Sequence, residues 1–327
     1  MLETPANYVV ASFTASDGYR CYYRRYVPAA EPAAPPRAHV VCIHGIQSHA
    51  GWYEHSCTRL SQAGYLVSFL DRRGAGLNEQ DRGDTPSYRR LLDDIAEFLE
   101  MNGEADPIEE TGGATLPLSG SATLPLSVPP TLPLSPSQPS SASPRLPVFL
   151  LAISWGGKLA AALQGRHPGS VDGLVLLCPG FFSRVGPSLG ERLHIAWARL
   201  FSPRRLFPVP LQNAELFTAT PRWQQFVRDD PLSLRRATAR FLAASVFLDR
   251  ALRTAPAQVH VPVLLLLGGK DRVIDNSRTR CFIEQFATKD KQIIEYPEAA
   301  HTLEFEADPK PFVEDIRAWL DRHCAVS

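Results

Sequence analysis

The sequence lacks the features that would direct a protein to a membrane, out of the cell or onto nucleic acid. Lys plus Arg and Asp plus Glu number 34 each, so the formal net charge is zero and no global field attracts nucleic acid or an anionic surface. No apolar run approaches the roughly 18 residues that a spanning helix needs. The first residues have neither the basic start nor the apolar run of a secretory signal. We therefore expect a cytoplasmic protein with no nucleic-acid partner and no obligate protein partner.

Cysteine is also scarce, and its spacing excludes the common metal patterns. The chain has six cysteines, none in a C-x-x-C pair, and no H-E-x-x-H run among its nine histidines. Cys42 and Cys178 lie inside apolar runs, where a free thiol behaves as a small hydrophobic group. We expect reduced structural cysteines, no metal site and no cofactor.

The 327 residues, of which 44% are hydrophobic, are enough to bury a large core. Short apolar runs alternate with helix-like segments after an initial hairpin, and this alternation is typical of a mostly parallel sheet covered by helices on both faces. The predicted strands span residues 8–13, 20–26, 39–43, 65–70, 147–153, 173–178, 261–267 and 292–296.

Two segments interrupt the alternation. Residues 103–145 are rich in Pro, Ser, Thr and Gly, and the unit TLPLS begins at residues 115, 123 and 131. We predict a disordered surface insertion there, with a Pro-rich docking segment as the alternative. Residues 181–257 are rich in Leu, Phe, Trp and Arg and contain no convincing strand, which predicts a helical cap. The core would then consist of residues 1–180 and 258–327.

The most informative segment is the one around Ser154. A predicted strand runs into Ala152-Ile-Ser154-Trp-Gly156, and a helix rich in small residues follows at once. This arrangement matches the nucleophile elbow G-x-S-x-G, in which a tight turn exposes the serine hydroxyl. Ala152 replaces the first glycine and adds one methyl group, while Gly156 keeps the other side of the turn open. Ser154 is therefore the predicted nucleophile, with an ordinary helix-capping serine as the alternative.

A serine nucleophile needs a base, and the base needs a group that orients it. In this fold the chain order is serine, acid, histidine. His301 follows the last predicted strand, and Asp271 follows the strand before it. Asp275 competes for the role of the acid, but its place just before a helix is better suited to capping. The sequence predicts a triad of Ser154, Asp271 and His301.

Acyl transfer also needs donors directed at the developing oxyanion. One would be the backbone N–H of Trp155, the residue after the nucleophile. The other should come from the loop after the third strand, where Gly45 permits an unusual backbone conformation. We predict the N–H of Ile46 as the second donor.

With these residues in view, the sequence resembles the monoglyceride lipase and lysophospholipase branch of the α/β-hydrolases. Residues 44–53, HGIQSHAGWY, are similar to the family's H-G-x-x-x-H-x-G-x-Y, and residues 71–76, DRRGAG, to its D-x-x-G-x-G. Residues 230–232, DPL, resemble an element of the family's cap. The resemblance implies an α/β-hydrolase fold with a mostly parallel eight-stranded sheet and an inserted helical cap. It also implies a serine hydrolase that cleaves acyl esters, most simply a monoacylglycerol lipase or lysophospholipase, through an acyl-enzyme.

The cap should select the substrate, a small-molecule or lipid ester. We expect Trp197 and Phe201 to line an apolar acyl-chain pocket together with Gly45, and the cap to touch a membrane surface transiently. The alternative for the apolar residues of the cap is that they pack it onto the core.

Other functions fit the same residues. A short-chain carboxylesterase, a thioesterase or a C–C bond hydrolase would keep the triad and change the substrate. A non-catalytic binding protein on the same scaffold would be expected to have lost a triad residue, and none is missing.

Overall fold

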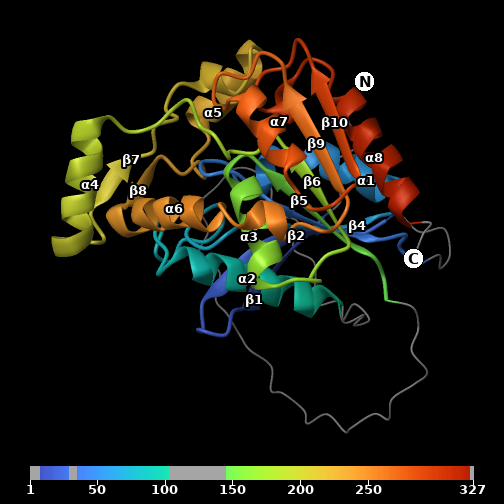
Figure 1. Ribbon diagram of the computed structural model, residues 1–327, viewed down its shortest axis with the longest axis horizontal. Helices are drawn as coiled ribbons and strands as arrows, with labels where there is room; N and C mark the ends of the chain where they lie inside the picture. Colours follow the sequence, from blue (N-terminus) through green and yellow to red (C-terminus); the bar gives the residue numbers. More distant parts are fainter. Residues whose placement is uncertain (1–7, 29–34, 104–144, 325–327) are drawn as a thin grey trace, which may run out of the picture.

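The central element of the fold is an eight-stranded sheet. The computed structural model of the protein describes residues 8–28, 35–103 and 145–324 (Figure 1). The strand order is β1-β2-β4-β3-β5-β6-β9-β10; the first two neighbouring pairs are antiparallel and the rest are parallel. The strands are β1 (Val9–Thr14), β2 (Arg20–Tyr26), β3 (His39–Ile43), β4 (Leu66–Leu70), β5 (Val148–Ile153), β6 (Gly173–Leu177), β9 (Val263–Gly268) and β10 (Lys291–Tyr296).

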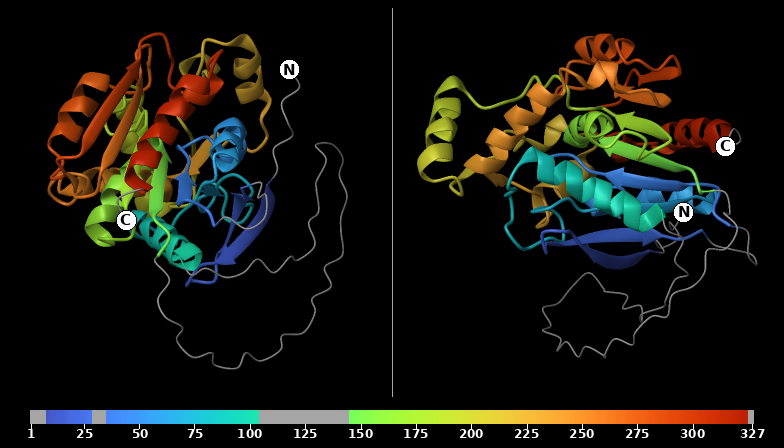
Figure 2. Two further views of the ribbon diagram at one scale, coloured as in Figure 1. Left: turned by 90° about the vertical axis from the view of Figure 1, so that its right-hand side faces the viewer. Right: turned by 60° about the horizontal axis from the view of Figure 1, so that its bottom comes forward.

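Helices cover both faces of this sheet, which explains why its central strands are continuous apolar runs. Every residue of β5 and β9 is buried. Helices α1 and α8 contact each other on one face, and α2 contacts α3 on the other (Figure 2). The helices of the core are α1 (Glu54–Gln62), α2 (Tyr88–Gly103), α3 (Trp155–Arg166), α7 (Asn276–Glu284) and α8 (Lys310–Cys324), with the 3-10 helices η1 (Ala50–Trp52) and η4 (Leu303–Phe305). The predicted α/β-hydrolase fold is confirmed.

The segment between β6 and β9 carries the helices expected of a cap. It contains α4 (Leu189–Phe201), α5 (Pro221–Asp229), α6 (Ala239–Ala251), η2 (Ala214–Leu216) and η3 (Ala255–Ala257). The prediction that it contains no strand is wrong, because β7 (Leu206–Pro208) and β8 (Arg236–Thr238) pair antiparallel. Strands of three residues are too short to show an alternating pattern, and only the fold brings these two together. The cap boundaries at residues 181 and 257 stay a prediction.

The ends of the predicted elements differ from the observed ones by a few residues. The strand predicted to begin at residue 261 begins at Val263, since Pro262 has no N–H to donate to a sheet. The insertion predicted at residues 103–145 lies outside the described residues apart from its two end residues.

None of the described helices combines the length and the apolar character needed to cross a membrane.

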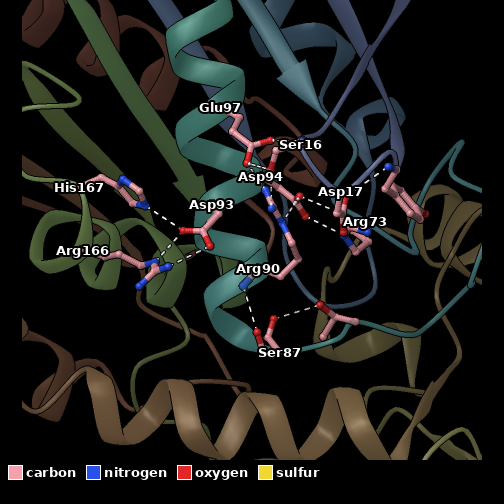
Figure 3. Close-up of polar contacts among 12 residues, drawn as sticks. Ser16, Asp17, Arg73, Ser87, Arg90, Asp93, Asp94, Glu97, Arg166 and His167 are labelled. Carbon is pink, nitrogen blue, oxygen red and sulfur yellow. Dashed lines mark hydrogen bonds and ion pairs between the residues drawn. The ribbon is translucent and has the colours of Figure 1, made fainter.

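A buried ion network fixes α2 to the loop that follows β4 (Figure 3). The guanidinium of Arg73 donates to both carboxylate oxygens of Asp94, at 2.9 and 2.8 Å, and to Asp17 at 2.9 Å. Arg90 donates to Asp94 from one turn earlier in α2, at 2.9 Å. Burial opposes ionisation of Asp94 and raises its pKa, although Arg73 and Arg90 partly offset this. The network holds the loop after β4, which contributes to the candidate site, in one position.

Candidate active site

Ser154 lies at a strained turn between β5 and α3. Its φ of 51° and ψ of −121° belong to a region that residues with a Cβ rarely adopt. The turn is secured by backbone bonds, since Ser154 N–H donates to the Leu177 carbonyl and its own carbonyl accepts from Gly157 and Gly180. Ala152 is fully buried in β5, so the turn forms with alanine in place of the first glycine. Gly156 is required, because a Cβ there would lie 2.7 Å from the His44 carbonyl oxygen.

The structure brings Ser154, His301 and Asp271 together. His301 lies between η4 and β10, Asp271 in the loop after β9, and Ser154 after β5, at neighbouring carboxyl ends of the strands. His301 Nε2 is 2.9 Å from Ser154 Oγ, and His301 Nδ1 is 2.6 Å from Asp271 Oδ2. Because a carboxylate only accepts, Nδ1 carries the proton and Nε2 is left to accept from the serine hydroxyl.

Asp271 is held as a carboxylate. Burial opposes its ionisation, but the charge and hydrogen bond of His301 and two backbone donors outweigh this effect and lower its pKa. Those donors are the N–H groups of Val273 and Ile274, at 2.7 and 3.1 Å from Oδ1. Asp275, the competing acid, instead caps α7 by accepting from the N–H of Arg278. The two carboxylates therefore have separate structural tasks.

The loop after β3 passes directly over Ser154. A Cβ on Gly45 would lie 3.1 Å from the Cβ of Ser154, so any larger residue would crowd the serine at this close approach. Gly45 N–H donates to Ser48 Oγ at 3.1 Å, which fixes the turn. In the described part of the chain, the N–H groups of Ile46 and Trp155 have no acceptor among the hydrogen bonds of the site. These are the two donors that the sequence predicts for an oxyanion.

A small cavity of about 10 Å³ lies beside Ser154 and His301. Ile46 of the loop after β3 and Leu211 and Phe217 of the cap are among the residues that line it. A volume of this size holds about one water molecule, so the cavity is too small to hold an acyl chain. The sequence offered no motif that singled out Leu211 or Phe217.

Trp197 and Phe201 are not among the residues that line this cavity, and their expected contact with substrate stays a prediction. They lie on α4 with 53% and 67% of their surface exposed, and their ring centroids are 5.1 Å apart. The side of α4 that faces the protein is formed by Ala198 and Ile195, which pack near Phe207. The apolar composition of α4 did not reveal which side faces inward.

A buried polar cluster, also missed as a site feature from the sequence, links the cap to the loop after β3. Asp230 Oδ2 accepts from His49 Nε2 at 3.0 Å, from Trp52 Nε1 at 2.7 Å and from Ser233 Oγ at 2.8 Å. Burial opposes ionisation of Asp230, but the bonds and charge from His49, with the other two donors, lower its pKa far below the usual value. The D-P-L resemblance was the one signal that marked Asp230.

A third potential metal ligand, Cys178, lies next to two residues of the predicted triad. Its thiol lies with Asp271 and His301 in a buried group whose ligand atoms are all within 4.8 Å of one another. Burial and the neighbouring Asp271 raise the pKa of Cys178 well above its usual value. In the structure His301 Nδ1 and Asp271 Oδ2 of this group already bond to each other.

Comparisons with known proteins agree with this architecture. A family model described as "Serine aminopeptidase, S33" matches residues 34–111 and 137–308. The monoacylglycerol lipase of Mycolicibacterium smegmatis is 27% identical over 95% of this chain and 96% of its own, and the human monoglyceride lipase 22% identical over 91% and 86%.

Solved structures show the same fold. The monoacylglycerol lipase of Paleococcus ferrophilus has a TM-score of 0.71 at 22% identity over 93% of this chain and 99% of its own. A monoglyceride lipase variant from Saccharomyces cerevisiae, in complex with a substrate analog, has a TM-score of 0.74 at 20% identity over 99% and 98%. The predicted enzyme class, a lipase- or esterase-like serine hydrolase, is confirmed. The chain belongs to the serine aminopeptidase S33 family of α/β-hydrolases, in its monoglyceride lipase-like branch.

Proposed function

We propose that this enzyme hydrolyses esters with a single acyl chain, as a monoacylglycerol lipase or lysophospholipase does, through an acyl-enzyme on Ser154. The observation that carries the proposal is the hydrogen-bonded series from Ser154 Oγ through His301 to Asp271, at 2.9 and 2.6 Å. A nucleophile, a base and an orienting acid within hydrogen-bond reach are the requirements for serine acyl transfer.

The reaction follows from these positions. As Ser154 Oγ bonds to the acyl carbon, its proton passes to His301 Nε2, and the anionic Asp271 stabilises the resulting imidazolium. The N–H groups of Ile46 and Trp155 hold the oxyanion. The C–O bond to the alcohol then breaks, and His301 returns the proton to the departing alcohol. Water next attacks the acyl-enzyme with His301 as base, which releases the carboxylic acid and regenerates Ser154.

The relatives and the apolar lining of the cavity support a lipid ester over a small polar one. Both relatives described above are named as lipases of monoacylglycerols. The cap residues that line the cavity, Leu211 and Phe217, are apolar, as the wall of an acyl-chain site should be. The short-chain carboxylesterase and thioesterase alternatives use the same triad. The non-catalytic alternative is disfavoured because all three groups keep hydrogen-bonding distances.

The cap also supports a transient contact with a lipid surface. Helix α4 exposes large apolar side chains that would be of use where the substrate is dispersed in a lipid phase. These side chains are Leu189, Leu193, Trp197, Leu200 and Phe201. On this proposal Trp197 and Phe201 act at the lipid surface, outside the cavity next to Ser154.

The first test is labelling of the purified protein with a fluorophosphonate probe, which reacts with activated serines. Ser154→Ala should lose the label and reduce turnover by roughly four or more orders of magnitude. Ser12→Ala, an exposed serine of β1, is the matched control and should label normally. A folded wild type that does not label, or a Ser154→Ala variant with near-native turnover, would overturn the assignment.

The substrate class requires a second measurement. We expect kcat/KM to rise with acyl length along a series of monoacylglycerols and to exceed that for acetyl esters. A flat or falling profile would favour the short-chain esterase, and a preference for acyl thioesters over oxygen esters would favour the thioesterase.

A further inference from the structure

Beneath the loop after β3 lies a buried guanidinium that the proposed mechanism does not use. Arg72 is 3% exposed and follows Asp71 at the end of β4. Its Nε donates to the Gly45 carbonyl at 3.4 Å, and its Nη2 donates to the Ile46 carbonyl. In the described chain Arg72 makes no ion pair, whereas Arg73 next to it pairs with Asp94 and Asp17. The bonding of Arg72 is thus directed at the loop carbonyls.

Two aromatic rings hold the same guanidinium. Its central carbon lies 5.3 Å from the ring centroid of Trp155 and 5.1 Å from that of Phe241. Trp155 is itself fixed, since its indole N–H donates to Ser245 Oγ at 2.9 Å. Burial lowers the pKa of Arg72 to about 9, so the group stays charged and keeps its donors at neutral pH. Arg72 therefore contacts the backbone of the Gly45–Ile46 segment and the side chain of Trp155, the two residues Ile46 and Trp155 being the predicted oxyanion donors.

The direction of the Ile46 N–H follows from peptide geometry. In a planar trans peptide the C=O and N–H point in opposite directions. The Gly45 carbonyl, which shares its peptide with the Ile46 N–H, is held by Arg72 and by His44 Nδ1 at 2.8 Å. The Ile46 N–H must then point to the opposite side of the loop, and Ile46 and Ser154 both line the cavity there.

His44 strengthens this arrangement because its tautomer is determined. Its Nε2 accepts from the backbone N–H of Arg72 at 3.1 Å, so Nδ1 carries the proton and donates to the Gly45 carbonyl. Burial and the charge of Arg72 hold the pKa of His44 well below its usual range, which keeps the ring neutral. The Gly45 carbonyl thus has two donors on the side away from Ser154.

We propose that Arg72 is a positioning residue for the oxyanion hole. Its guanidinium orients the Gly45–Ile46 peptide and packs against the ring of Trp155. This inference rests on the proposed function, since it concerns the same reaction. An oxyanion forms only as Ser154 attacks, so Arg72 should affect the transition state more than substrate binding.

The test compares Arg72→Met with Arg82→Met. Arg82 makes the same kind of contact elsewhere, since it donates to the carbonyls of Gly76 and Leu232 at 2.9 and 2.6 Å. We expect Arg72→Met to lower kcat roughly 10- to 100-fold with KM within about 2-fold, because one misdirected donor costs up to that order. Affinity for a trifluoromethyl ketone, which forms the tetrahedral adduct, should fall by a similar factor. Arg82→Met should keep kcat and ketone affinity.

Arg72→Lys provides a second variant if the methionine variant does not fold. It keeps the charge but lacks the planar fork that reaches two carbonyls, so kcat should again fall with KM unchanged. Native kcat in a folded Arg72→Met or Arg72→Lys variant would overturn the inference, as would equal losses in the Arg72 and Arg82 variants. Failure of the proposed function is distinct, because it appears as activity or labelling that does not depend on Ser154.

Discussion

The loops at the carboxyl ends of the strands and helix α4 of the cap are built in opposite ways. Asp271 and His301 are almost fully buried, and the side-chain polar atoms of the three triad residues are each held by a specific partner. In α4, by contrast, Leu189 and Leu200 are each 75% exposed. A site that stabilises a developing charge gains from groups fixed in advance. A surface that meets a lipid aggregate gains from apolar side chains left uncovered.

Two neighbouring arginines repeat this contrast on a smaller scale. Arg73 is neutralised by Asp94 and Asp17 and serves to join α2 to the core. Arg72, one residue earlier, is bound by carbonyls and aromatic rings next to Ser154. The difference teaches that adjacent residues of one motif can have separate structural and functional tasks, because successive side chains leave the loop in different directions.

The largest expected effect comes from changing Asp271, the acid of the predicted triad and part of the buried region compared above. Asp271→Asn should lower kcat by about four orders of magnitude, because the amide no longer favours the tautomer in which Nε2 accepts from Ser154. Steady-state kinetics on a soluble ester provide the measurement. Asp275→Asn, which caps α7, is the control and should keep kcat. A comparable loss in both variants would point to disrupted packing.

A second change breaks the link between cap and core. Asp230→Ala removes the shared acceptor of His49, Trp52 and Ser233 and leaves those donors buried, so the free energy of unfolding should fall by about 3 kcal/mol. Urea denaturation at neutral pH measures this quantity. Asp229→Ala, the exposed neighbour, should change it by less than about 0.5 kcal/mol. If both variants were equally stable, the cluster would not be what holds the cap.

Glu304 tests how burial in the core changes the pKa of a carboxyl group and, through it, the stability of the protein. Its Oε1 accepts from the N–H of Ser56 at 3.1 Å, and burial raises its pKa from 4.5 to about 7. The folded state binds this proton more tightly than the unfolded chain does, so Glu304 should reduce stability progressively as the pH rises from 4.5 to 7.

Glu304→Gln keeps an acceptor for Ser56 and removes the ionisation. At pH 8 the variant should be more stable than the wild type by about 2–3 kcal/mol, and the gain should vanish at pH 4. Thermal or urea unfolding across this range is the measurement, with the exposed Glu298→Gln as control. A gain that does not depend on pH would contradict the explanation.

The smallest effect on the free energy of unfolding is expected from the exposed side chains of α4. Leu193→Gln combined with Leu200→Gln should change the free energy of unfolding by less than about 0.5 kcal/mol, because both side chains are already in water. Binding to phosphatidylcholine vesicles and turnover of dispersed long-chain monoacylglycerols should nevertheless fall several-fold, with hydrolysis of a soluble ester unchanged. Val9→Gln with Val10→Gln, exposed on β1, is the matched control. Equal vesicle binding by all variants would exclude α4 as the lipid contact.

The sequence by itself determined the sheet, the elbow and the positions of the three residues of the predicted triad. Buried parallel strands are short apolar runs, and the elbow needs small residues at fixed offsets from Ser154, so both leave local signals. Asp271 and His301 could be located because each follows a strand, and parallel strands end at one edge of the sheet.

Only the tertiary structure decided which surfaces those elements present to one another. The inward side of α4, the pairing of β7 with β8 and the position of Leu211 and Phe217 beside the cavity at Ser154 all depend on contacts between segments far apart in the chain. The role proposed for Arg72 rests on contacts with Gly45, Trp155 and Phe241, which belong to three separate segments. Local composition does not reveal such contacts. The same residues could form the same helices and loops in many other tertiary arrangements.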